Sequence, residues 1–411
     1  MDLKSKYQYT YFIKPFKVKE KNYKKYLIKL LKDKKMYLKI WEKEANIEIY
    51  DYFLPGIREK VFYGFDKSNE QLRRFKNLNV TQKANILSDQ ECVQFSYKLK
   101  KDTPGKIGDS NGIFFGINKI DIICFNTGIC FILLKCCVED IKNFTDILNF
   151  NYKFKEVNSE LSDLKHYEKI SIQSDLYKNS KELKDFLSEY TVTKDSNLKY
   201  EDEKFYVYSY TCIDGENWSN ENMFEDIKAQ FWKYKNVLPS EYNVDVKENC
   251  DCVKDEFGNM EYARMGVNKN AVTLLCSGIN SYNYTRLNFE FENQYLYTYI
   301  FALYQATYLK KVIHDVKAKK NIKKVRKNLN AFLYNMQVKE ITKDKNGMEF
   351  YKRIEKEIKL DNLYLETMEI YGVALNSNKV ENEISTVIVW IIVGICVVLN
   401  ILNTVILLKL S

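Results

Sequence analysis

Histidine and proline are scarce in this chain, and the scarcity of histidine narrows the classes of function that the chain can have. Among 411 residues there are 2 histidines, His166 and His314, and 4 prolines. A Ser-His-Asp triad needs a histidine close to its nucleophile, and neither histidine stands in such a context. Two histidines also leave few ligands for a mixed Cys/His zinc site. The sequence therefore favours neither a triad hydrolase nor a Cys/His zinc domain.

A glycine-rich phosphate-binding loop is missing as well. The nearest approach is residues 103–108, where Lys106 follows Gly105 but no glycine stands upstream at P-loop spacing. Ile107 occupies the place where such a loop needs a hydroxyl for its metal ion. Acidic residues are frequent, yet no spacing singles out a carboxylate pair. We therefore predict a protein that is not an enzyme and uses no cofactor, with an enzyme of unrecognised type as a less favoured alternative.

Ten cysteines are present, but their placement disfavours disulfides and metal binding. Cys250 and Cys252 form the only close polar pair, and this spacing without a second pair or a nearby histidine is a weak metal signal. Free cysteine within an apolar run behaves as a small hydrophobic residue. We therefore predict reduced thiols and no metal site. Five cysteines lie in such runs: Cys124, Cys130, Cys136, Cys137 and Cys276.

The composition is that of a folded chain with a modest positive charge. Hydrophobic residues make up 45% and charged residues 29%, which excludes a disordered chain and leaves enough apolar mass for real cores. The length favours two folded units. The net charge of +9 suits an anionic lipid surface or an anionic small-molecule or nucleotide ligand. It is too small to indicate nucleic acid, so no direct nucleic-acid binding is expected.

The longest uncharged run lies in residues 385–411, and it predicts a transmembrane helix. About 24 residues there carry no charge before Lys409, enough to cross a hydrocarbon core ~30 Å thick. Trp390 and Lys409 suit the two membrane interfaces. Residues 1–8 contain no apolar stretch, so we expect no secretory signal peptide. The sequence thus predicts a single-pass protein of the cell membrane, bound to the lipid bilayer, with the bulk of the chain in the cytoplasm.

Polar side chains recur on one helical face of this predicted span. Polar groups in hydrocarbon are costly and usually face a partner helix or a water-filled path. Two interpretations stay open, which are packing between copies of the chain (favoured) and the lining of a pore. Both need a homo-oligomer. The face comprises Trp390, Val393, Cys396, Asn400, Asn403 and Thr404.

A second apolar run, residues 120–138, is predicted to form a β-hairpin and not another span. It contains Asp121 and Lys135, and the central residues 126–128 (Asn-Thr-Gly) are typical of a turn between two β-prone runs. A similar strand-turn-strand pattern follows at residues 262–277.

Local signals also place several helices. Ser68, with Glu70 in the first turn, predicts a helix that runs to Asn79. Helical spacing of apolar residues predicts further helices over 323–338 and 347–371.

The order strand-turn-strand-helix appears twice, which indicates two α+β halves. From residue 290 onward the pattern is helical and free of proline, as expected for a coiled-coil stalk that associates with copies of itself. We therefore predict an α+β cytoplasmic region followed by a long helical stalk and one C-terminal transmembrane helix. The expected segments are 1–178, 179–289, 290–384 and 385–411.

The densest group of charges lies at the middle of the predicted stalk. Asp315 is the one acidic residue within it. One interpretation is an electropositive ring that attracts anionic lipid or a phosphate-bearing ligand. The other, which is favoured, is a solvated face of the stalk. The cluster comprises Lys310, Lys311, Lys317, Lys319, Lys320, Lys323, Lys324, Arg326 and Lys327.

Four stretches resemble a divergent group of bacterial CorA-like membrane proteins. They are residues 51–55, 125–131, 299–305 and 347–365. The layout of α+β region, stalk helices and C-terminal membrane segment is similar to that of the CorA-type metal-ion channels. The Gly-Met-Asn signature of those channels is missing here, which removes the basis for magnesium selectivity.

The resemblance implies an oligomeric membrane protein with a cytoplasmic sensing domain. Its expected role is that of an ion channel or a membrane-permeabilising effector, with antiviral defence among the roles the resemblance allows. The alternative, from a different class, is a membrane-anchored scaffold or interaction protein that conducts no ions.

Overall fold

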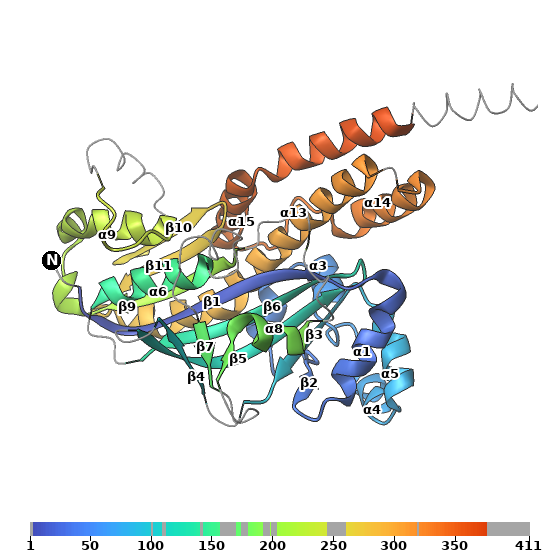
Figure 1. Ribbon diagram of the computed structural model, residues 1–411, viewed down its shortest axis with the longest axis horizontal. Coiled ribbons are helices and arrows are strands. Elements are labelled where there is room, and N and C mark those ends of the chain that lie inside the picture. The colour runs from blue at the N-terminus through green and yellow to red at the C-terminus, as the bar shows by residue number, and fades with distance from the viewer. Residues whose placement is uncertain are drawn as a thin grey trace, which may run out of the picture. The chain divides into compact units, whose positions relative to one another are not determined.

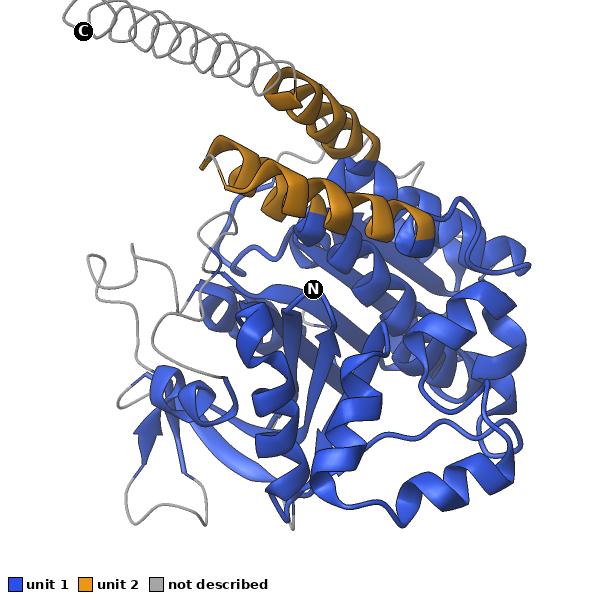
Figure 2. Cartoon of the chain, turned by 90° about the vertical axis from the view of Figure 1, so that its right-hand side faces the viewer, with its two compact units in different colours: residues 1–308, 335–360 blue, residues 309–334, 361–411 orange. Residues whose placement is uncertain are grey.

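The computed structural model describes residues 3–99, 102–108, 112–139, 143–156, 170–173, 180–191, 198, 204–244, 260–318 and 320–375. The chain divides into two compact units, and each is described by itself. The first, called the body, contains residues 1–308 and 335–360. The second, called the helical unit, contains residues 309–334 and 361–411. Figure 2 shows the body in blue and the helical unit in orange.

An 11-stranded mixed sheet organises the body. Its main path runs β10-β11-β9-β1-β6-β5-β4-β7-β8, and β3 joins β5 and carries β2 (Figure 1). Strands β9 and β11 run parallel, and the other pairs are antiparallel. The strands are β1 (Ser5–Lys17), β2 (Met36–Leu38), β3 (Cys92–Tyr97), β4 (Thr103–Ile107), β5 (Ile113–Phe125), β6 (Ile129–Val138), β7 (Ile170–Ile172), β8 (Lys181–Glu182), β9 (Tyr206–Ile213), β10 (Ala263–Asn268) and β11 (Ala271–Ser277).

Helices and short turns of helix pack on this sheet and continue into the helical unit. The α-helices are α1 (Tyr23–Lys32), α2 (Ile47–Tyr52), α3 (Pro55–Val61), α4 (Asn69–Lys76), α5 (Val80–Ser88), α6 (Phe144–Glu156), α8 (Leu183–Tyr190), α9 (Phe224–Asn236), α11 (Ser281–Tyr284), α12 (Arg286–Glu290), α13 (Leu296–Lys317), α14 (Ile322–Met336) and α15 (Lys345–Ile358). The shorter elements are the 3-10 helices η1 (Glu20–Asn22), η2 (Gly215–Asn217) and η3 (Glu221–Met223), and a π-helix, η5 (Phe291–Tyr295).

Both predicted hairpins are confirmed. Strands β5 and β6 meet at the turn 126–128, where Gly128 has a φ of +80° and its amide donates to the Phe125 carbonyl at 2.9 Å. Glycine adopts this left-handed conformation without a steric penalty, which explains why the turn ends on it. Strands β10 and β11 form the second hairpin.

The predicted helix after Ser68 is also confirmed. The Ser68 side chain accepts a hydrogen bond from the Gln71 amide, and the Gln71 side chain accepts one from the Ser68 amide. Together these two bonds form a complete capping box. The helix ends at Lys76, three residues before the expected Asn79. The predicted helix 323–338 is observed as α14. The predicted helix 347–371 is interrupted at Lys359, which has a φ of +55°.

Alternation along the strands gives the sheet two buried faces. On one face, residues such as Phe12, Ile122 and Leu134 join the main hydrophobic core with side chains from α1, α5, α6 and α8. On the other face, Phe125 stacks on Tyr304 of α13 with ring centroids 3.6 Å apart. Helices therefore cover both sides of the central strands, and the body is a layered α+β fold.

A single sheet crosses the boundary predicted between the two α+β halves. Thr10 of β1 is paired with Cys136 of β6 on one side and with Ser209 of β9 on the other. Strands from residues 1–178 and 179–289 thus share one ladder of hydrogen bonds. The predicted α+β character is observed, but it takes the form of one large mixed sheet and not of two packed halves.

The predicted transmembrane helix, and the membrane and ion-transport role that depended on it, are corrected. No helix within the described ranges combines the length and the apolar composition that a bilayer crossing requires. Even α13, with 22 residues, carries Lys310, Lys311 and Asp315 in its second half. Residues 385–411, on which the span was predicted, lie outside the described residues.

The predicted stalk is corrected as well, because α13 begins as a core helix. Thr298, Tyr299 and Tyr304 lie on different sides of this helix, and each is at most 1% exposed. A stalk helix would keep one side in water. The apolar run that suggested a self-associating helix is instead buried within the body.

The helical unit contains the end of α13, most of α14 and the helical residues 361–375. Several of its apolar side chains are buried, among them Val312, Val325 and Leu329. Lys317 and Glu366 form an ion pair at 3.5 Å. This unit holds the basic cluster.

Replacement of Gly128 by alanine tests the β5–β6 turn. A Cβ at this position would lie 2.3 Å from the Val18 carbonyl oxygen, and the φ of +80° is unfavourable for alanine. We expect Gly128→Ala to lower the free energy of unfolding by about 1–3 kcal/mol, measured by urea denaturation. Gly56→Ala is the matched control, since nothing lies within 4 Å of its added Cβ. Equal stability of the two variants would contradict this account of the turn.

Candidate anion-binding surface

The structure separates the predicted basic cluster into lysines that pair with Asp315 or Glu366 and cations that are exposed on α14. Lys311 lies 3.4 Å from Asp315, and Lys320 also pairs with Asp315. Burial on its own raises the pKa of the Asp315 carboxyl, but its hydrogen bond from Lys320 and the positive charges of Lys311 and Lys320 outweigh this and lower the pKa. Lys317 is paired with Glu366. These three lysines are thus paired with two carboxylates, which offset most of their positive charge.

The remaining residues of the cluster are placed differently. Lys310 is half-buried on α13, and Lys319 lies outside the described residues. Four cations are exposed on α14, and they are called the basic face of α14: Lys323, Lys324, Arg326 and Lys327.

The amphipathic pattern of α14 turns this basic face toward solvent. Val325, Leu329 and Phe332 recur at spacings of four and three residues and are at most 8% exposed. The helix contains no acidic residue, so no carboxylate of its own can neutralise the basic face through i,i+4 pairs. Positive potential therefore accumulates along one side of α14.

Helix stability does not explain these charges. Lys323 and Lys324 lie in the first turn of α14, where the unpaired backbone N–H groups already give the helix a positive end. Cations at that end oppose the helix dipole, at a cost of about 0.3–1 kcal/mol each when exposed. The same geometry adds the dipole to the positive field of the side chains, which favours an anion near the start of α14.

The predicted pore or packing face cannot be compared with the structure. Its residues, Trp390, Val393, Cys396, Asn400, Asn403 and Thr404, all lie outside the described residues. The same holds for Cys250 and Cys252. Among the residues that the structure does describe, no group of three or more His, Cys, Asp or Glu side chains could hold a metal ion.

A partly buried network of charges on the sheet escaped the sequence analysis. Glu292, in the π-helix η5, accepts from Lys135 of β6 at 2.7 Å and from the Tyr11 hydroxyl of β1 at 2.6 Å. In the next strand, Lys119 of β5 lies 3.1 Å from Asp121. Lys119 and Lys135 are directly opposite each other in the ladder. The two carboxylates offset the repulsion between these like charges.

The charges of this network are matched to one another. Burial on its own raises the pKa of the Glu292 carboxyl, but the positive charge of Lys135 and the hydrogen bonds from Lys135 and Tyr11 outweigh it and lower the pKa. Burial and the neighbouring Glu292 raise the pKa of Tyr11 well above its usual value. The network therefore anchors η5 to the sheet with ionised, mutually paired groups. The sequence showed no sign of it because Glu292 lies 157 residues from Lys135 and 281 residues from Tyr11.

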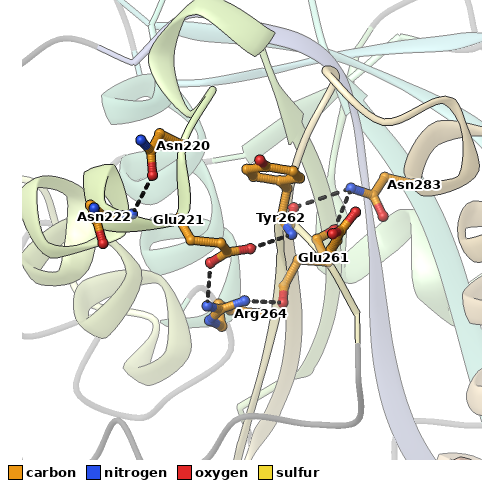
Figure 3. Close-up of polar contacts among 8 residues, drawn as sticks. Asn220, Glu221, Asn222, Glu261, Tyr262, Arg264 and Asn283 are labelled. Atoms are coloured by element: carbon orange, nitrogen blue, oxygen red, sulfur yellow. Dashed lines mark hydrogen bonds and ion pairs between the residues drawn. The ribbon is translucent and has the colours of Figure 1, made fainter.

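A second polar cluster fixes the chain at the start of β10 (Figure 3). Glu221 of η3 accepts from the Tyr262 amide at 2.8 Å and from the Arg264 guanidinium at 2.7 Å. The buried amide of Asn283 donates to the carbonyls of Glu261, Tyr262 and Ser277 at 3.1–3.2 Å. These bonds hold Tyr262 at a φ of +54°, which a tyrosine rarely adopts.

Neither of these two partly buried clusters presents a ligand site. In both, the carboxylate meets a cation and backbone or hydroxyl donors, so the interactions are internal to the body. The basic face of α14 differs from them because it is exposed and its charge is not balanced within the helix. It is the strongest candidate for a functional surface in the described residues.

Comparisons of the chain with protein-family models, with curated proteins and with solved structures found no match. The resemblance to CorA-like proteins and the expected homo-oligomer therefore stay predictions.

Replacement of Glu292 by glutamine tests the buried network. The carboxyl pKa is lower in the folded state than its ordinary 4.5, so its stabilisation is present above that value and is lost as the pH falls through the folded pKa. We expect Glu292→Gln to lower the free energy of unfolding by about 1–3 kcal/mol at pH 7, measured by urea denaturation across a pH series. The difference from the native chain should shrink below pH 4.5. The exposed control, Glu44→Gln, should change neither the free energy of unfolding at pH 7 nor its dependence on pH. If the loss of stability in Glu292→Gln persisted at acid pH, it would argue against the paired carboxylate.

Removal of the Asn283 amide tests the second cluster. Asn283→Ala leaves three carbonyls without their buried donor, so we expect the free energy of unfolding to fall by about 1–3 kcal/mol. Asn222→Ala, in the exposed turn of η3, is the control. A loss no greater than that of the control would show that the amide does not hold the start of β10.

Proposed function

We propose that this protein is a non-enzymatic binding protein, and that the basic face of α14 recognises a phosphate-bearing polyanion. One observation carries the proposal. Lys323, Arg326 and Lys327 are exposed on a helix without a carboxylate, whereas the neighbouring Lys311, Lys317 and Lys320 are paired with Asp315 and Glu366. The sensing role expected for the soluble region is kept here, and ion conduction is not.

Because the basic face is exposed to solvent, its ligand has to carry several negative charges. A single ion pair in water contributes about 0–1 kcal/mol, so one exposed lysine holds a monovalent anion only weakly. A polyanion contacts several cations at once and releases the counterions condensed along it. The basic face therefore favours a ligand with several phosphates over a single carboxylate or a lone phosphate.

Neutralisation of the basic face is the direct test. The triple variant Lys323→Gln, Arg326→Gln and Lys327→Gln removes three charges while keeping good helix formers. With inorganic polyphosphate as the probe and the full chain, we expect the affinity at low salt to fall at least about tenfold. The slope of log K against log salt should decrease by about 2–3. Fluorescence anisotropy or titration calorimetry measures both.

A matched control separates this effect from net charge. Lys24→Gln, Lys25→Gln and Lys32→Gln remove the same charge from exposed positions of α1. This variant should bind polyphosphate about as well as the native chain. If both triple variants lose affinity equally, or if the native chain does not bind, the basic face of α14 is not the site.

A further inference from the structure

Tyr334, near the end of α14, is far more exposed than a tyrosine usually is. Its side chain is 86% exposed, the highest value among the large hydrophobic residues that the structure leaves in solvent. An exposed aromatic ring gains nothing from burial in the fold. A single exposed hydrophobic residue is normal on a protein surface, whereas tyrosine is enriched among the residues that contribute most to binding. Because Tyr334 is a single residue, its neighbours on the helix decide what it could bind.

Those neighbours are the cations of the basic face. Lys323, Lys327, Asn330 and Tyr334 follow one another at spacings of four, three and four residues, which places them along one side of the helix. All four are exposed. From Lys323 to Tyr334 the side extends about 16 Å. A ligand that lies along it would meet positive charge first, then an amide, then an aromatic ring.

We propose that this side of α14 binds a segment of single-stranded nucleic acid. The inference rests on the proposed function, and it names the polyanion. Phosphates contact Lys323, Arg326 and Lys327 in the first half of the helix. A base stacks on the ring of Tyr334 in the second half, which carries no charged residue from 328 to 336. Asn330, between the two, has an amide that can donate to or accept from a base edge.

The single strand is favoured over other polyanions by the combination of charge and ring. In a duplex the bases are stacked on one another and paired, so their faces are closed to a tyrosine. Polyphosphate has no ring and would not use Tyr334. An acidic protein segment could pair with the lysines, but it would not explain the exposed ring of Tyr334, which lies about 10 Å beyond Lys327 along the helix. Single-stranded bases supply both the charge and the aromatic face.

This inference departs from the sequence expectation that the chain does not bind nucleic acid directly. That expectation rested on the modest net charge and on the absence of a known nucleic-acid fold signature. The distribution of charge matters more than its total, and neither the exposure of Tyr334 nor the neutralisation of the other lysines is visible in the sequence.

The test uses the full chain and three probes. They are an oligothymidylate of about 12 nucleotides, a hairpin duplex of matched charge, and inorganic polyphosphate. The variant Tyr334→Leu removes the ring and keeps a strong helix former at an exposed position, so folding is preserved. Tyr334→Phe retains a stacking ring, and Tyr37→Leu removes an exposed tyrosine of β2 as a control.

We expect the oligothymidylate to bind more tightly than the duplex. Tyr334→Leu should weaken oligothymidylate binding about 5- to 100-fold, the range of one stacked base. The same variant should leave polyphosphate binding unchanged, while Tyr334→Phe and Tyr37→Leu should resemble the native chain.

The two proposals fail in different ways. If polyphosphate binds through the basic face but Tyr334→Leu has no effect on the oligothymidylate, the nucleic-acid inference is wrong and the proposed function stands. A duplex that binds as tightly as the single strand also overturns the inference. If none of the three probes binds the native chain, the proposed function fails together with the inference.

Discussion

Strand β1 is the constraint on which the body depends, because it is hydrogen-bonded to β6 on one side and to β9 on the other. The Thr10 hydroxyl donates to Asn151 Oδ1 at 2.8 Å and lies 2.7 Å from Ser209 Oγ, and the Tyr234 hydroxyl donates to the same Ser209 Oγ at 2.7 Å. These groups are buried, so a slip of β1 by one residue would leave several of them unpaired and would exchange its two faces. Register, and with it the whole sheet, is fixed at this strand.

Fixing the register of β1 also fixes the opposite face, where the charges lie. Tyr11, Lys135 and Lys119 form one row across β1, β6 and β5. Glu292 of η5 accepts hydrogen bonds from the first two. The ion pair of Glu292 and Lys135 adds little net stability, but its disruption would leave one charge without a partner and largely shielded from water. It therefore opposes movement of η5 and of the first part of α13 along the sheet. Short π-helices interrupt regular helices at positions of this kind, where one side chain must be aimed at a partner.

Local features of this fold were predictable, and distant pairings were not. The turn at Gly128 and the cap at Ser68 depend on residues within a few positions, so the sequence contains all that determines them. The pairing of Thr10 with Ser209 joins residues far apart in the chain, and no local pattern distinguishes it from two separate half-domains. The stalk was wrongly predicted because a run of apolar and aromatic residues with helical spacing fits both a self-associating helix and a helix buried in its own domain. The basic cluster was found from composition, but the division between paired and exposed lysines needed Glu366 and Asp315 in place.

At the basic face of α14 the charges work against the local structure. In other places charges support it, as where Glu70 lies in the first turn of α4 and where Asp315 accepts from Lys320. At the start of α14, cations meet the positive end of the helix and one another, and the helix supplies no acidic residue to relieve either repulsion. A surface selected only for solubility or stability would mix both signs. An anionic ligand removes both repulsions at once, so the same residues that destabilise the free helix become favourable in the complex. This reversal is what separates a binding surface from a solvated charge run.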